Sequence, residues 1–182
     1  MTPWPHVASG PQPALPWRAQ VGTYALILSA TTPSVLQIGR LGPLLIQAGF
    51  YIYVGSAFGP GGLQARLAHH CRRAARPHWH IDYVRAVVPL SEVWYTYDTV
   101  RREHDWALAM QRARGASIPL PRFGASDCTC AAHFFACPTL PAWRAFQRRI
   151  QQGCPAHAPM YRSRLPIASA MTDTPYGKRL QA

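Results

Sequence analysis

A chain of 182 residues, 48% of them hydrophobic, is long enough for one domain with its own core. It lacks a run of about 18 apolar residues that would span a membrane, and it does not begin like a signal peptide, so we expect a cytoplasmic protein. Its 19 Lys and Arg residues against 7 acids give a net charge of +12. Such a basic domain suits a polyanion, which favours nucleic acid over a membrane as its partner.

The distribution of proline divides the chain into three regions. Residues 1–20 are proline-rich and lack periodicity, so we expect a flexible leader. Residues 21–152 form the expected domain, and residues 153–182 an expected flexible basic tail. Five cysteines, an odd number, argue against a disulfide framework and indicate reduced thiols.

Within the domain, apolar patterns predict strands first and then helices alternating with strands. We expect strands at 22–30, 35–39, 50–57 and 91–97, and helices at 63–75, 100–115 and from 139 to about 152. The strand at 35–39 is expected to form a hairpin with the first strand. This order indicates an α+β domain with a central sheet of mostly antiparallel strands.

The helix expected at 63–75 carries a basic face. Arg66, His70 and Arg73 lie at i, i+4 and i+7, and the approach to the helix is rich in glycine. Such a face either binds phosphates or is simply solvated. For contact with nucleic acid we expect Arg72, Arg73, Arg76, His78 and His80.

The helix expected at 100–115 places an acid on its apolar side. Glu103 shares that side with Trp106 and Met110. Burying a carboxylate is costly unless it is paired or binds a metal ion. Glu103 therefore either forms a salt bridge with a core arginine or is a ligand for a hard cation such as Mg²⁺ or Mn²⁺.

Two further segments contain residues that bind metals. If residues 78–83 are extended, His78, His80 and Asp82 share one face, which suggests a metal cluster or a polar edge near the active site. Cys128, Cys130 and His133 lie close together, and with Cys137 they could bind zinc. Small buried thiols that pack a loop against the sheet are the alternative reading of that cluster.

Several separate phrases together resemble the GIY-YIG endonuclease superfamily. They are Gly22-Thr23-Tyr24, then Tyr53-Val54-Gly55, then Arg66 with His70, and finally Glu103. The phrases GFYIYVGSAFGPGGLQARLAHH, HWHIDY and FGASDCTCAAHFF further resemble a prokaryotic branch of that superfamily. Members of this branch occur alone or fused to a base-excision glycosylase of the endonuclease III type.

The resemblance implies a small domain with a three-stranded, mostly antiparallel sheet flanked by helices. The long gap between the two tripeptides implies an inserted hairpin. By position, Tyr24 would activate or position water, Tyr53 would bind the nucleophile or phosphate, and His70 would support proton transfer. Arg66 would neutralise charge on the phosphate, and Glu103 would hold a single divalent metal ion, Mg²⁺ or Mn²⁺.

The leading hypothesis is therefore a metal-dependent endonuclease that acts on DNA more readily than on RNA. The branch suggests a role in repair or in processing single-stranded or structured DNA, with a link to a base-excision glycosylase. The alternatives are a nucleic-acid-binding module that does not cut and a protein-interaction domain. The sequence leaves open the preferred substrate and the oligomeric state.

Overall fold

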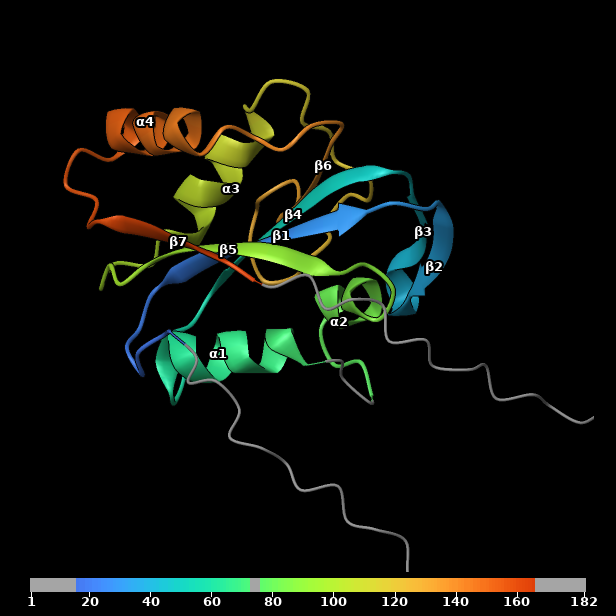
Figure 1. Ribbon diagram of the computed structural model, residues 1–182, viewed down its shortest axis with the longest axis horizontal. Helices are drawn as coiled ribbons and strands as arrows, with labels where there is room; N and C mark the ends of the chain where they lie inside the picture. The colour runs from blue at the N-terminus through green and yellow to red at the C-terminus, as the bar shows by residue number, and fades with distance from the viewer. Residues whose placement is uncertain (1–15, 73–75, 166–182) are drawn as a thin grey trace, which may run out of the picture.

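The computed structural model describes residues 16–72 and 76–165, and Figure 1 shows its arrangement. Over these residues the strands and helices alternate in the order expected of an α+β domain. In chain order they are β1 (Thr23–Ala30), β2 (Ser34–Ile38), a 3-10 turn (Gly39–Leu41), β3 (Gly42–Ile46), β4 (Gly49–Ser56), α1 (Gly62–Cys71), α2 (His80–Arg85), β5 (Leu90–Thr96), α3 (Glu103–Gln111), β6 (Phe134–Cys137), α4 (Trp143–Gly153) and β7 (Met160–Arg164). None of the helices in the described part is long and apolar enough to cross a membrane.

The main sheet is antiparallel and larger than expected. It has five strands in the order β6-β4-β1-β5-β7. The expectation of a three-stranded sheet is therefore wrong, because it lacks the two edge strands β6 and β7. β6 has only four residues, and β7 has the polar sequence MYRSR, so neither shows the apolar alternation that predicts a strand. The three central strands, β4, β1 and β5, are those that the sequence indicated.

The inserted hairpin is present, but its pairing differs from the expected one. β2 pairs with β3 in a separate two-stranded sheet, whereas the neighbours of β1 are β4 and β5. The strand expected at 35–39 is therefore not the hairpin partner of the first strand. The register Ser34↔Ile46 to Ile38↔Gly42 closes the hairpin around Gly39 and Gly42, which both have positive φ.

Helices cover both faces of the main sheet: α1 and α2 lie on one side and α3 and α4 on the other (Figure 1). The alternation along β1 follows from this arrangement. Leu26 and Leu28 belong to the core shared with α1 and α2, whereas Ala25 and Ile27 belong to the core shared with α3 and α4. β1 is therefore buried on both faces, which explains its almost uninterrupted apolar sequence.

The folded unit extends beyond both expected boundaries. Trp17 is buried in the core, and the carbonyl of Gln20 accepts a hydrogen bond of 2.8 Å from Leu63 N–H, so residues 16–20 are not a loose leader. At the other end, β7 pairs with β5, which places residues 160–164 of the expected tail within the sheet. Residues 1–15 and 166–182 lie outside the described residues.

Three helices are also shorter than expected, including α3, which spans Glu103–Gln111 instead of 100–115. α1 ends at Cys71, where Arg72 is already extended, rather than at residue 75. α4 begins at Trp143 with Ala142 as its N-terminal cap, four residues after the expected start at residue 139.

Gly22 marks the point where β1 begins, and it has no room for a side chain. A Cβ atom there would lie 2.1 Å from the carbonyl oxygen of Thr96 and 2.7 Å from a methyl carbon of Leu63. Because the Thr96 oxygen belongs to the backbone of β5, it cannot rotate away.

We expect Gly22→Ala to lower the free energy of unfolding by about 3 kcal/mol, because the added methyl group must separate β1 from β5. Urea unfolding followed by circular dichroism measures this change. Gly59→Ala is the matched control, since a Cβ at Gly59 meets open space. Equal stability of the two variants would contradict the steric argument.

Candidate functional site

Four of the residues expected at the active site line a single pocket of about 410 Å³. Tyr24 comes from β1, Tyr53 from β4, Arg66 from α1 and Glu103 from the first turn of α3. Because Tyr24 pairs with Gly55 at the end of the β1–β4 ladder, the pocket lies at one end of the sheet. Residues from both helical layers can meet there.

Glu103 is held as a carboxylate by its neighbours. The Ser56 hydroxyl donates a 2.7 Å hydrogen bond to Oε2, and Nδ1 of His133 lies 3.1 Å from Oε1. Burial alone would raise the pKa of Glu103, but His133 and Ser56 outweigh it and hold the pKa below its usual range. The nearest arginine, Arg101, is 3.9 Å away and half exposed, so Glu103 is not paired with a core arginine.

Tyr24 and His70 form a buried pair. The Tyr24 hydroxyl lies 2.8 Å from Nε2 of His70, and the two side chains are almost completely buried. Burial lowers the pKa of His70 to about 3 and raises the pKa of Tyr24 well above its usual value. Both groups are therefore neutral near pH 7, and Nε2 of the neutral imidazole can accept a hydrogen bond from the hydroxyl.

This burial changes the interpretation of α1. His70 faces the core. The expectation that it belongs to an exposed basic face with Arg66 and Arg73 is therefore wrong. Arg73 lies outside the described residues. Within the described part of α1, Arg66 is the arginine that reaches the pocket.

Gly55 allows Tyr24 to reach its position. A Cβ atom at Gly55 would lie 2.5 Å from the Tyr24 hydroxyl oxygen, so only glycine fits opposite this tyrosine. Tyr53, two residues before Gly55, points to the same side of β4 as Tyr51 and lies edge-on to His70. Burial and the charge of Glu103 raise the pKa of Tyr53, so this phenol is also neutral.

Two guanidinium groups flank the pocket, each placed over an aromatic ring. Cζ of Arg66 lies 4.2 Å from the centre of the Trp79 ring, and Cζ of Arg101 lies 4.9 Å from that of Phe58. Arg101 also donates a 3.0 Å hydrogen bond to the Ser56 hydroxyl. Stacking fixes the plane of a guanidinium while its edge stays available for phosphate oxygens.

The suggested metal cluster of His78, His80 and Asp82 required an extended segment, but α2 begins at His80, and these three residues do not form such a cluster. Oδ2 of Asp82 accepts the backbone N–H groups of His78 and Trp79 at 2.9 and 3.0 Å, and Oδ1 lies 3.1 Å from His69. Asp82 is thus a helix cap, which the alternation of the sequence concealed.

The residues expected to contact nucleic acid fall into three groups. His78 and His80 line the pocket, and Nδ1 of His80 accepts a 3.3 Å hydrogen bond from Gly124 N–H. Arg72 and Arg76 are exposed near the end of α1, outside the pocket lining. Arg73, as noted, falls outside the described residues.

Cys128, Cys130 and His133 do come together, and a fourth residue joins them. One donor atom from each of these three and from His104 lie within 4.8 Å of one another. Cys137, the expected fourth member, is buried in β6 and is not part of this group. His104 follows Glu103 directly on α3, about 25 residues away from the cysteines in the sequence, so local spacing could not reveal it.

Sequence reasoning also missed Arg101, Ser126 and Asp127, which line the pocket. Arg101 lies two residues before Glu103, and only this proximity in the sequence could have indicated that Arg101 belongs to the site. Ser126 and Asp127 belong to residues 112–133, a connection without helix or strand whose path the sequence did not reveal.

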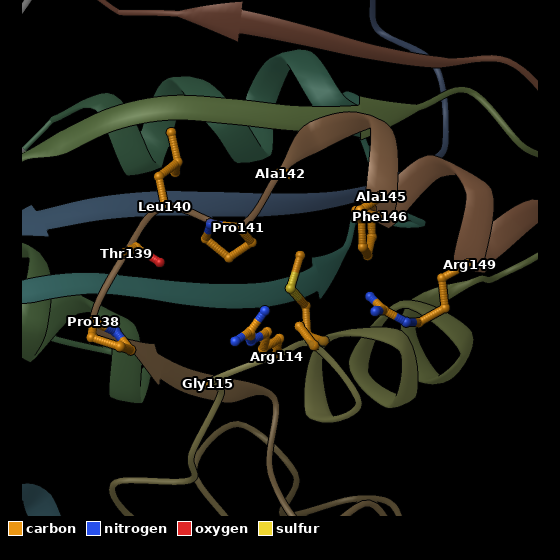
Figure 2. A pocket seen from close by; sticks show the side chains of 12 residues that line it. Arg114, Gly115, Pro138, Thr139, Leu140, Pro141, Ala142, Ala145, Phe146 and Arg149 are labelled. Carbon is orange, nitrogen blue, oxygen red and sulfur yellow. The ribbon is translucent and has the colours of Figure 1, made fainter.

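A second pocket of about 450 Å³ lies between α3 and α4, with Arg114 and Arg149 at its border (Figure 2). Its lining combines these arginines with proline, alanine and other apolar residues. None of the residues that line it is an acid, histidine, cysteine or tyrosine. It therefore has no group that could bind a metal ion or transfer a proton, and the pocket around Glu103 is the better candidate.

We expect His70 to make stability depend on pH. Because its pKa is about 3 in the folded chain and 6.5 when exposed, the unfolded chain binds an extra proton between these values. The free energy of unfolding should fall by about 2 kcal/mol between pH 7 and pH 5 on this account. Urea unfolding at several pH values measures this, and in His70→Gln that part of the pH dependence should disappear. Parallel pH profiles for the two proteins would contradict a buried neutral His70.

Comparison with known proteins gives a family. No curated protein and no solved structure matches the chain. A family model described as "Domain of unknown function DUF123" matches residues 23–154. The matched range runs from β1 to the end of α4 and contains all the residues of the candidate pocket. Since the match covers well over half of the chain, the protein belongs to the DUF123 domain family.

Proposed function

We propose that the protein is a GIY-YIG-type endonuclease that hydrolyses phosphodiester bonds in DNA with the help of one divalent metal ion. The observation that carries this proposal is the convergence of Tyr24, Tyr53, Arg66 and Glu103 on one pocket, with His70 behind Tyr24. These residues come from four separate elements, and their types match the three tasks of the reaction. Those tasks are activation of water, binding of phosphate and binding of a metal ion.

The neutral pair of Tyr24 and His70 supports the activation of water. The Tyr24 hydroxyl donates a hydrogen bond to Nε2 of His70 over the 2.8 Å contact, which leaves the phenol oxygen free to accept a hydrogen bond from a water molecule and to aim it at phosphorus. As that water attacks, its proton passes to a phosphoryl oxygen of the substrate, because His70 with a pKa of about 3 is too weak a base to take it. Tyr24 thus needs no free phenolate, which its raised pKa makes unfavourable. Tyr53 orients the water or the phosphate from the adjacent strand.

Arg66 and Arg101 supply the positive charge of the site. Negative charge on the phosphoryl oxygens increases as the nucleophile attacks, and preorganised donors stabilise it. Both guanidinium groups are preorganised by their aromatic partners, Trp79 and Phe58. The net charge of +12 adds a general attraction for nucleic acid.

The donor set of the pocket fits a hard cation. Glu103 is ionised, retains 14% exposure on its side chain, and shares the pocket with the carboxylate of Asp127. Mg²⁺ and Mn²⁺ prefer such oxygen donors, so Glu103 would hold the ion, and Asp127 is the other acid in the pocket lining. When bound, the metal supplies stabilisation of the negative charge on the leaving oxygen.

The proposed substrate is single-stranded or structured DNA, in a repair or processing step in the cytoplasm. This part rests on the resemblance to the branch whose members occur alone or fused to a base-excision glycosylase. A nucleic-acid-binding module of the same fold is the alternative. It would use the arginines but would not need an ionised Glu103 beside a buried pair of Tyr24 and His70.

We expect metal-dependent cleavage that requires Arg66 and Glu103. Labelled single-stranded, duplex and branched DNA is incubated with the protein and Mg²⁺ or Mn²⁺, and products are resolved by electrophoresis. Arg66→Ala and Glu103→Gln should each lower the cleavage rate by about 100-fold or more, because each removes charge stabilisation from the transition state. Asp105→Asn is the matched control for Glu103→Gln, because Asp105 pairs with Arg102 on the same helix turn and does not line the pocket.

DNA binding without cleavage by the wild-type protein would leave the binding module as the function. Cleavage that both pocket variants retain would mean that another site or a contaminating nuclease is responsible.

We expect Tyr24→Phe to slow cleavage by about 100-fold or more, because the attacking water loses the phenol oxygen that aims it at phosphorus. The dissociation constant for DNA should stay within about twofold, since the phenol carries no charge. Fluorescence anisotropy measures binding and gel assays measure cleavage. Tyr161→Phe is the control. Tyr161 lies on the edge strand β7, which β5 separates from β1, and this variant should cleave at the normal rate. A loss of binding equal to the loss of rate would assign Tyr24 to substrate binding instead of positioning the attacking water.

A further inference from the structure

We propose that His104, Cys128, Cys130 and His133 bind one zinc ion, at a site separate from the hard-cation position at Glu103. The four donor atoms lie within 4.8 Å of one another and come from two segments, the first turn of α3 and residues 128–133. In tetrahedral zinc with bonds of about 2.3 Å to sulfur and 2.0 Å to nitrogen, neighbouring donors are about 3.3–3.8 Å apart. The Sγ of Cys128 and Nε2 of His133, at 3.5 Å, already have this separation.

The donor chemistry distinguishes this cluster from the pocket beside it. Two thiolates and two imidazoles form a soft set that suits Zn²⁺ and does not suit Mg²⁺, which requires oxygen. The cluster also has access to solvent for loading, because His104 is exposed and both cysteines are partly exposed, while His133 is buried. Four protein ligands close a tetrahedral site, as in structural zinc centres.

His133 has the second partner that zinc-bound histidines require. Its Nε2 faces Cys128, and its Nδ1 lies 3.1 Å from Oε1 of Glu103. A histidine that binds zinc through one ring nitrogen almost always directs the other at a carboxylate, a carbonyl or water, which fixes its tautomer and orientation. The contact with Glu103 completes this arrangement with the groups already present.

The ion would also explain how the connection between α3 and β6 keeps its shape. Residues 112–133 contain no helix or strand, and connections of this length without regular structure are uncommon in compact domains. Zinc would tie the end of this segment to the start of α3. The same segment brings Ser126 and Asp127 to the pocket, so the zinc would hold the pocket wall in place.

The full-length protein, purified under reducing conditions and dialysed against metal-free buffer, should contain about one zinc per chain by mass spectrometry. After removal of the zinc, cobalt(II) should give the intense visible absorption of tetrahedral thiolate coordination. Cys128→Ser, Cys130→Ser and His104→Ala should each weaken zinc binding by at least about tenfold against a competing chelator. Cys154→Ser is the control, because Cys154 lies outside the group, and it should retain full affinity.

Glu103→Gln tests the role of Glu103 as the partner of His133. It should bind zinc about 10- to 100-fold more weakly while keeping the cobalt spectrum, because it removes a supporting contact but no ligand. Since His104 is exposed, His104→Ala leaves the fold intact and keeps the ligand test informative even if a cysteine variant does not fold.

A wild-type chain that lacks zinc and gives no cobalt absorption would overturn the proposal. So would zinc binding that survives in the Cys128→Ser/Cys130→Ser double variant, or a disulfide between these cysteines in the freshly isolated protein. All of these measurements omit nucleic acid and Mg²⁺. A failure here is therefore separate from a failure of the proposed nuclease activity.

Discussion

The site depends on a single partly buried carboxylate that joins three segments distant in the sequence. Glu103 begins α3 and contacts Ser56 at the end of β4 and His133 just before β6. A charge in this position is unfavourable unless its neighbours compensate for lost hydration, and both neighbours lower its pKa. α3 packs on the face of the sheet opposite α1, and this carboxylate ties the start of α3 to the end of β4 and to the segment before β6.

The pocket is divided electrostatically into a neutral half and a charged half. Tyr24 and His70 are buried under α1, where the low dielectric keeps both groups uncharged. Arg66, Arg101 and the carboxylate of Glu103 form the charged side of the pocket lining. A substrate phosphate entering from solvent would meet the charged groups first and would exclude water from them, which strengthens their interactions.

Helices and strands that follow from short-range periodicity could be predicted from the sequence. Contacts between residues far apart in the chain could not. The tyrosines at 24 and 53 lie in strongly apolar strands and Glu103 lies beside apolar residues of a helix, so these elements could be predicted from the pattern. The convergence of these residues on one site was expected only from the resemblance to the GIY-YIG endonucleases. The proximity of His104 to Cys128 and Cys130 depends on the path of residues 112–133, and these residues show no periodic apolar pattern. β7 was missed because its partner β5, and not its own polar sequence, makes it a strand. Asp82 misled because a capping carboxylate and a metal ligand look alike in a sequence.

The close approach of Tyr24 to Gly55 has a consequence for sequence variation. The hydroxyl occupies the volume that a side chain at position 55 would fill, so the two positions cannot change independently. A family member with a larger residue at the position of Gly55 must carry a shorter residue at the position of Tyr24, or the two strands must separate. In an alignment of the family, these two columns should therefore covary, and a tyrosine opposite a glycine identifies the chains that retain the buried contact with the histidine.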